Sequence, residues 1–282
     1  MQTVTSLDPL RNALAVLRQD GPIALVPTMG ALHEGHLTLV REARKRAAHV
    51  VASIFVNPRQ FGANEDLSRY PRPLERDQAL LKAEGTSLLW APTVEAMYPD
   101  GYATNISVSG VSAGLCGEDR PGHFDGVATV VNKLFNQVQP DLAFFGEKDW
   151  QQLAVIRRMA RDLDLALPRV EAIHGVATVR EADGLALSSR NVYLSPEQRA
   201  QAACLPRAMD AAIGALRAGA GVAGALADLV TTLIDGGFSS VDYAEVRTAD
   251  SLSPVAALDG RLVRLFVAAR IGGTRLIDNK PV

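Results

Sequence analysis

The chain has 282 residues, with 29 Lys and Arg against 31 Asp and Glu, so its formal net charge is −2. This length predicts one large domain or two modest ones, and a hydrophobic content of 48% excludes a disordered protein. The near-zero charge argues against non-specific nucleic-acid binding, which needs a surplus of Lys and Arg.

Cysteine usage and the first residues indicate a cytoplasmic protein. Cys116 and Cys204 are the only cysteines and lie far apart in the sequence, which suits a reducing compartment. Residues 1–19 lack the basic and then apolar pattern of a signal peptide. Because no apolar run approaches the ~20 residues of a membrane span, we expect no membrane partner.

Residues 1–175 alternate short apolar runs with amphipathic stretches. The predicted strands are Ile23–Val26, Val50–Val56, Ser87–Trp90, Leu142–Phe145 and Arg169–Ile173. The predicted helices are Leu37–Ala48, Leu74–Glu84, Val127–Val138 and Trp150–Leu163. The runs are mostly continuous, as in strands buried on both faces. This alternation predicts an α/β domain with a mostly parallel sheet, in which ligands bind beyond the carboxyl ends of the strands.

Residues 176–282 predict a second, smaller α+β domain. The segment Ser195–Gln198 is typical of a helix start, with Ser as the cap and Pro at the first helical position. Ala-rich helices follow to about Gly236, and then strands at Val241–Val246 and Leu262–Ala269. The spaced glycines of 219–224 follow a helical run instead of a strand, so we interpret them as a turn and not as a dinucleotide-binding motif.

The loop after the first predicted strand has the most specific pattern in the chain. Residues 27–37 read Pro-Thr-Met-Gly-Ala-Leu-His-Glu-Gly-His-Leu, and free backbone N–H groups at a helix start would bind phosphate there. The loop is not a P-loop, because His36 replaces the lysine, and the histidine spacing does not fit a zinc motif. His-x-Gly-His after a first strand is typical of nucleotidyl-transferring enzymes. We favour this interpretation over a Gly-rich turn with two surface histidines.

Other polar segments follow the later strands. Asn57 and Gln60 offer amides to hydroxyl or carboxylate oxygens, although an Asn-Pro sequence is most often only a turn. Lys148 is placed to meet phosphate charge, beside Asp149 as a helix cap. Ser188–Arg190 provides hydroxyls and a fixed charge suited to pyrophosphate, or else an ordinary linker. The polar loop 114–124 is either a lid or a dimer contact.

Six blocks in this order resemble the pantothenate synthetase (pantoate–β-alanine ligase) family. They are Thr28–His36, Phe55–Gly62, Arg69–Asp77, Arg120–Lys133, Phe145–Leu153 and Val179–Leu194. The resemblance implies a Rossmann-like parallel sheet of the HIGH-motif nucleotidyl-transferase type, with the smaller α+β domain as a lid. It also implies a homodimeric ligase of coenzyme A biosynthesis that uses ATP with Mg²⁺. Pantoate would form pantoyl-adenylate and pyrophosphate, and β-alanine would then displace AMP.

The resemblance also implies roles for individual residues. Those matched to ATP binding are Met29, Gly30, Ala31, Leu32, His33, Glu34, Gly35, His36, Gly146, Glu147, Lys148, Asp149, Val179, Leu187, Ser188, Ser189 and Arg190. The catalytic set is His36 as the proton donor, with His33, Lys148 and Arg190. Gln60 matches a ligand of both pantoate and β-alanine, Gln152 matches a second ligand of pantoate, and Asn57 would be a further neighbour of pantoate. No residue is matched to a metal. Arg59 and Leu187 depart from the expected pattern without removing a catalytic group.

Three alternatives stay open at this point. An aminoacyl-tRNA synthetase would need an RNA-binding domain and a basic surface, for which the segment after Gly175 leaves little room. A small nucleotidylyltransferase would end near the first domain and lack the Gln60 and Gln152 blocks. A nucleotide-binding module without activity would have no reason to keep His36 together with Lys148.

Overall fold

A six-stranded parallel sheet organises the amino-terminal part of the computed structural model, which describes residues 1–62 and 65–282. Its strands are β1 (Gln2–Val4), β2 (Ile23–Thr28), β3 (His49–Ile54), β4 (Leu88–Trp90), β5 (Leu142–Gly146) and β6 (Ile173–Val176), in the order β1-β4-β3-β2-β5-β6. The chain runs from β2 to one side through β3 and β4, and then to the other side through β5 and β6. The carboxyl ends of β2 and β5 therefore form the switch point at which open α/β sheets bind ligands.

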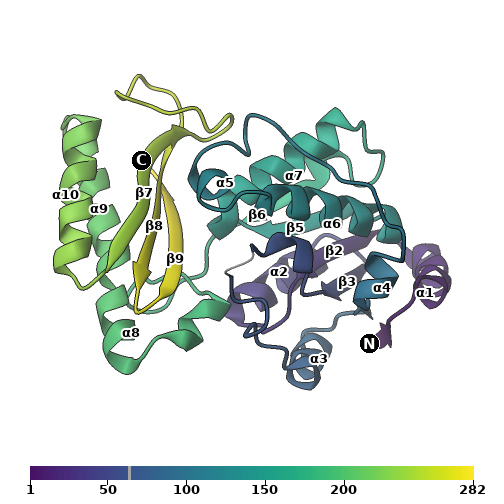
Figure 1. Cartoon of the computed structure of the whole chain (residues 1–282). Helices are drawn as coiled ribbons and strands as arrows, with labels where there is room; N and C mark the ends of the chain where they lie inside the picture. Colours follow the sequence, from purple (N-terminus) through teal and green to yellow (C-terminus); the bar gives the residue numbers. More distant parts are fainter. Residues whose placement is uncertain (63–64) are drawn as a thin grey trace.

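Helices cover both faces of this sheet (Figure 1). They are α1 (Leu7–Asp20), α2 (Glu34–Arg44), α3 (Leu74–Ala83), α4 (Val94–Met97), α5 (Leu115–Asp119), α6 (His123–Val138) and α7 (Trp150–Asp162). Ile23 and Leu25 of β2 pack in the core with α1, α6 and α7, whereas Ala24 and Val26 pack with α2 and α3. Because successive residues of a strand point to opposite faces, both faces are buried, which explains the continuous apolar runs.

The carboxyl-terminal part contains a three-stranded antiparallel sheet. Its strands are β7 (Ser240–Thr248), β8 (Val263–Ile271) and β9 (Thr274–Pro281), preceded by helices α8 (Pro196–Ala202), α9 (Cys204–Arg217) and α10 (Val222–Asp235). Figure 1 shows α9 and α10 on the face of this sheet that is turned away from the parallel sheet. Within the described ranges, every helix is too short or too polar to cross a membrane.

The structure confirms the predicted fold class and most of the predicted elements. The helix start at Ser195 is correct, since the Ser195 side chain accepts a hydrogen bond from the Gln198 N–H at 3.2 Å. The strand predicted at Arg169–Ile173 is wrong over its first residues, where the 3₁₀ helix η3 (Val170–Ala172) precedes β6. Its short apolar run was equally compatible with a turn.

Five of the α-helices and strands in the described residues were not predicted. These are β1, α1, α4, α5 and β9. Strand β9 has no apolar run because three of its four buried positions are polar: Thr274, which is 6% exposed, and Asp278 and Asn279, each 3% exposed. A pattern of apolar residues cannot detect such a strand.

The two parts of the chain are packed against each other. One core cluster is built from residues between Leu185 and Leu276, but Leu252 and Phe266 belong to the cluster that contains α6 and α7. The predicted boundary between residues 175 and 176 falls inside β6. The division into domains at 1–175 and 176–282 therefore stays a prediction.

Candidate active site

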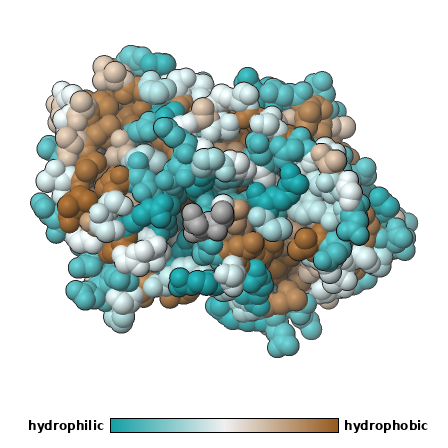
Figure 2. All heavy atoms as spheres, viewed as in Figure 1, coloured by the Kyte–Doolittle hydropathy of each residue, from teal (hydrophilic) through white to brown (hydrophobic). Residues whose placement is uncertain are grey.

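A cavity of about 230 Å³ lies at the carboxyl ends of β2 and β5. Fourteen of the predicted site residues line it: Met29, His33, Gly35, His36, Gln60, Gly146, Lys148, Asp149, Gln152, Val179, Leu187, Ser188, Ser189 and Arg190. Six others do not line it: Gly30, Ala31, Leu32, Glu34, Asn57 and Glu147. In Figure 2, hydrophilic residues gather on the face where the two parts of the chain meet. The fold thus brings four separate segments of the sequence to one place.

The backbone of the loop after β2 is held by an aspartate from α3. Asp77 is 1% exposed and accepts hydrogen bonds from the N–H groups of Ala31 at 2.8 Å and Leu32 at 2.9 Å. The Gly30 N–H donates to Thr28 Oγ1 at 3.2 Å. The prediction that these N–H groups are free for phosphate is therefore wrong, because the protein uses them itself. Asp77 also holds Ala31 at a φ of 51°, a left-handed conformation that non-glycine residues rarely adopt.

The two histidines of this loop form a reciprocal capping box at the start of helix α2. His33 is the N-cap, and its Nδ1 accepts a hydrogen bond from the Gly35 N–H at 3.2 Å. His36 Nδ1 in turn accepts from the His33 N–H at 3.3 Å, and the two rings lie 4.1 Å apart. Because each Nδ1 is an acceptor, each neutral ring carries its proton on Nε2. Both side chains therefore offer an N–H donor to a ligand in the cavity.

Both histidines are neutral near pH 7. Burial lowers the pKa of His33 to about 4 and the pKa of His36 to about 3, and the positive charge of Lys148 acts in the same direction. Because its pKa is lowered, His36 supplies no positive charge to the cavity near pH 7. His36 acts there as a neutral hydrogen-bond donor.

We expect the unligated protein to lose stability as the pH falls from about 6.5 to 5. His33, His36 and His123 have folded-state pKa values of about 4, 3 and 4, against 6.5 when unfolded. The unfolded chain therefore binds more protons in this window, and the free energy of unfolding decreases by about 1.4 kcal/mol per pH unit for each histidine. Urea unfolding between pH 5 and 7.5 measures the slope. His123→Asn should make it shallower, and an unchanged slope would contradict the assignment.

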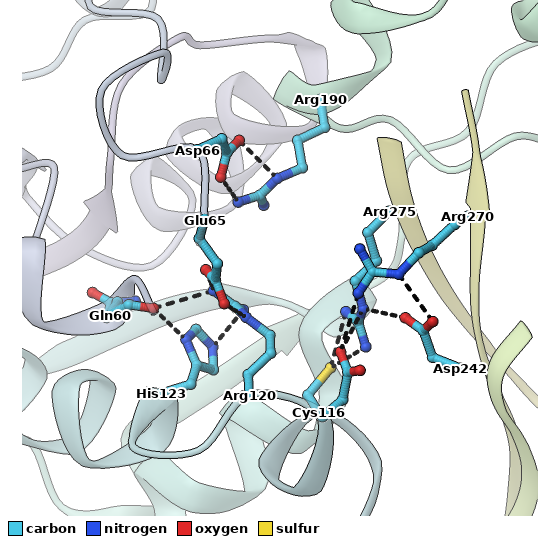
Figure 3. Close-up of polar contacts among 11 residues, drawn as sticks. Gln60, Glu65, Asp66, Cys116, Arg120, His123, Arg190, Asp242, Arg270 and Arg275 are labelled. Atoms are coloured by element: carbon cyan, nitrogen blue, oxygen red, sulfur yellow. Dashed lines mark hydrogen bonds and ion pairs between the residues drawn. The ribbon is translucent and has the colours of Figure 1, made fainter. Parts of the chain in front are cut away.

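Arg120 and His123 hold the backbone of Gln60 (Figure 3). His123 Nδ1 donates to the Gln60 carbonyl oxygen at 2.8 Å, and Arg120 Nη2 donates to the same oxygen at 3.1 Å. Arg120 Nη1 also lies 3.0 Å from His123 Nε2, and Arg120 pairs with Glu65 through contacts of 2.7 and 2.5 Å. The loop 114–124, which the sequence left open as a lid or a dimer contact, thus contributes Arg120 and His123 to the cavity wall.

Asn57 positions the side chain of Gln60. Its Nδ2 donates to Gln60 Oε1 at 2.9 Å and to the Gly126 carbonyl at 3.1 Å, and its Oδ1 accepts from the Tyr98 hydroxyl at 2.9 Å. A side chain at Gly126 would place its Cβ 2.1 Å from the Arg59 carbonyl, so only glycine lets α6 approach this turn. The Arg59 side chain is exposed and lies over the Tyr98 ring, away from the cavity.

Lys148 and Arg190, which the family resemblance matches to ATP binding, both line the cavity. Lys148 lies in the 3₁₀ turn η2 (Glu147–Asp149), where Asp149 makes no side-chain cap, so its predicted capping role is wrong. Arg190 lies in the 3₁₀ helix η4 (Ser189–Tyr193) and pairs with Asp66 at 2.8 and 3.2 Å (Figure 3). In the part of the chain that the structure describes, Lys148 has no ion-pair partner, unlike Arg190 and Arg120.

One wall of the cavity is apolar. The α6 residues Val127, Val130, Val131 and Leu134 line it together with Phe55 and Phe145. Their helical spacing predicts a buried core face, so the sequence did not single them out. Of the polar residues that the sequence missed, Asp77 and Arg120 lie inside blocks of the family resemblance, which was the available signal.

Three histidines, a lysine and two arginines line this cavity, which lies at the carboxyl ends of strands in a Rossmann-like parallel sheet. This is the place at which α/β enzymes of this fold class bind small molecules. A family model described as pantoate–β-alanine ligase matches residues 2–281. The pantothenate synthetase of Novosphingobium aromaticivorans is 68% identical over 100% of this chain and 99% of its own length, and that of Sphingopyxis alaskensis is 59% identical over 100% of both. The chain belongs to the pantoate–β-alanine ligase family, and it is an enzyme that joins pantoate to β-alanine.

Solved structures agree with this fold. The pantothenate synthetase of Thermus thermophilus superposes with a TM-score of 0.91 at 50% identity, covering 99% of both chains. The pantoate–β-alanine ligase of Francisella tularensis, solved in complex with β,γ-ATP and β-alanine, has a TM-score of 0.83 at 31% identity, covering 100% of this chain and 97% of its own. Among residues 1–62 and 65–282, no group of three His, Cys, Asp or Glu side chains is arranged to hold a metal ion.

Proposed function

We propose that the chain makes pantothenate in two steps within the cavity at β2 and β5. In the first, a pantoate carboxylate oxygen attacks the α-phosphorus of ATP, and the bond to pyrophosphate breaks. In the second, the amine of β-alanine attacks the acyl carbon of pantoyl-adenylate, releases AMP and loses a proton. The observation that supports this proposal most is that an apolar wall, amide donors and cationic groups line the same cavity.

Pantoate fits the half of the cavity between α6 and Gln60. Its two methyl groups would pack on the apolar wall of Val127, Val131 and Leu134. Because Gln60 Oε1 already accepts from Asn57, the free Nε2 amide of Gln60 is left to donate to a pantoate oxygen. Gln152, on the first turn of α7, lines the same cavity and would bind the other polar end.

The phosphates of ATP fit the opposite half. The Nε2–H groups of His33 and His36 and the Lys148 ammonium would stabilise the charge that develops on the α-phosphate. A second cavity of about 700 Å³, which Lys148, Ser188 and Arg190 also line, gives room for the leaving pyrophosphate. Mg²⁺ would arrive with ATP and be held mostly by phosphate and water oxygens, since it binds few protein ligands in such sites.

The carboxyl-terminal part is proposed to act as a lid. It already contacts the other part near the cavity through the pair of Arg190 with Asp66. A second contact joins Arg275 to Asp119 at 2.9 Å, and Asp242 of the same antiparallel sheet also pairs with Arg275, at 2.8 Å. Excluding water would protect the adenylate from hydrolysis. Homodimer formation and a cytoplasmic location also stay predictions.

The decisive experiment is a pyrophosphate assay across acid substrates. We expect pyrophosphate release from Mg-ATP to require pantoate, and AMP and pantothenate to appear only when β-alanine is also present. Lactate and an α-amino acid, each added in place of pantoate, are the controls that test whether any carboxylate is sufficient. Equal pyrophosphate release with an amino acid in place of pantoate would contradict the substrate assignment and favour the alternative of an aminoacyl-tRNA synthetase.

A further inference from the structure

The last strand of the chain reaches the turn that carries Lys148. Asn279 in β9 is 3% exposed. Its Nδ2 donates hydrogen bonds to two consecutive carbonyl oxygens, those of Glu147 and Lys148, each at 2.9 Å. These carbonyls belong to η2, the turn between β5 and α7. A residue 131 positions away in the sequence therefore holds the backbone on which the Lys148 side chain is mounted.

The orientation of the Asn279 amide is itself determined by its neighbours. Its Oδ1 accepts a hydrogen bond from Arg264 Nε at 2.8 Å, so the amide nitrogen must face the two carbonyls. The Arg264 guanidinium lies 3.8 Å from the centre of the Trp150 ring, at the first residue of α7. The Trp150 indole N–H donates to the Ala249 carbonyl at 2.8 Å. Residues of β8 and β9 and the turn after β7 thus contact both the Lys148 turn and the first residue of α7.

We propose that Asn279 is a positioning residue for the adenylate-forming step, because it holds the Glu147–Lys148 backbone so that the Lys148 ammonium meets the phosphates of ATP. This inference rests on the proposed function, in which Lys148 contacts ATP. A buried carbonyl that loses its donor shifts to find another, and a displacement of about 1 Å in a catalytic group lowers the rate about 100-fold. Asn279 does not need to touch any substrate for this effect.

The test separates the two chemical steps in the full-length protein. Asn279→Asp keeps the size of the side chain and an acceptor for Arg264, but it removes the donor to the two carbonyls. We expect pantoate-dependent pyrophosphate release to fall about 100-fold, while the conversion of added pantoyl-adenylate and β-alanine to pantothenate stays within about threefold. Should Asn279→Asp fail to fold, Arg264→Met tests the same contact by releasing the amide, and a fall of about tenfold in the first step is expected.

Lys280→Met is the matched control. Lys280 lies on the same strand, but its Nζ contacts the Pro206 carbonyl and Asp210, away from the Lys148 turn. This variant should be less stable yet retain both rates. The proposal would be overturned if folded Asn279→Asp kept the original rate of the first step. It would also be overturned if the variant lost both steps equally. Lys148→Met distinguishes the two proposals. If Lys148→Met also retains the rate of the first step, the role of Lys148 in the proposed function fails. If Lys148→Met loses this rate while Asn279→Asp retains it, only the positioning role of Asn279 fails.

Discussion

Replacing Lys148 with methionine is expected to lower the rate of pantoate-dependent pyrophosphate release by about 100- to 1,000-fold, corresponding to roughly 3–4 kcal/mol of transition-state stabilisation. Lys148 lines both the cavity at β2 and β5 and the adjoining larger cavity, so its charge lies where the α-phosphate and the leaving pyrophosphate would meet. Methionine keeps most of the length of the side chain and removes only the charge. A stopped assay of pyrophosphate at saturating pantoate measures the effect.

Lys133→Met is the control for this variant. Lys133 lies on α6 with its ammonium 4.7 Å from the centre of the Tyr102 ring, and it does not line the cavity. We expect it to leave the rate within about threefold of the original. If Lys148→Met kept more than a tenth of the rate, Lys148 would not be the main electrostatic group of the first step.

Replacing His36 with alanine is expected to lower turnover by about 100-fold or more, because it removes a preorganised N–H donor from the developing charge. The chain should still fold, since the lost contact with the His33 N–H costs about 1 kcal/mol, as for other helix caps. Single-turnover formation of pantoyl-adenylate measures the rate, and thermal unfolding checks the fold.

His174→Ala serves as the comparison for His36→Ala. The His174 ring lies beside Phe144 on β6 and β5, outside the cavity lining. It should retain nearly the original turnover. Original rates from His36→Ala would remove His36 from the mechanism and leave the step to His33 and Lys148.

Two arginines of the site are neutralised before any ligand binds. Asp66 pairs with Arg190, and Glu65 pairs with Arg120, so a carboxylate balances the charge of each guanidinium. The pairing keeps the pKa of Asp66 below its usual value, because Arg190 favours the charged carboxylate and this outweighs the opposing effect of burial. This pairing shows how a chain with a net charge of −2 can gather lysine and arginine side chains at one cavity.

The parallel sheet and its switch point could be predicted from the sequence because they depend on local patterns. Continuous apolar runs such as 23–26 and 142–145 are typical of strands buried on both faces, and the structure confirms both as parts of β2 and β5. The histidine loop follows the first of these runs directly. Its position at the carboxyl end of a central strand therefore followed from the order of the residues alone.

The supporting residues could not be predicted in the same way. Asp77, Arg120 and Asn279 have ordinary polar surroundings in the sequence, and each acts on a backbone group at least 45 positions away. The α6 residues that form the apolar wall have the same spacing as any buried helix face. Only the folded chain shows which apolar helix face lines the cavity at β2 and β5.

By itself, the sequence determined the class of fold, the family resemblance and fourteen of the residues that line the cavity. Only the tertiary structure decided how those residues are held and what charge they carry. His36 is neutral because it is buried beside Lys148, and Lys148 is held in place because a strand from the other end of the chain bonds to its turn. Periodicity and capping are short-range properties of the sequence, whereas burial and electrostatic interactions depend on distances that exist only after folding.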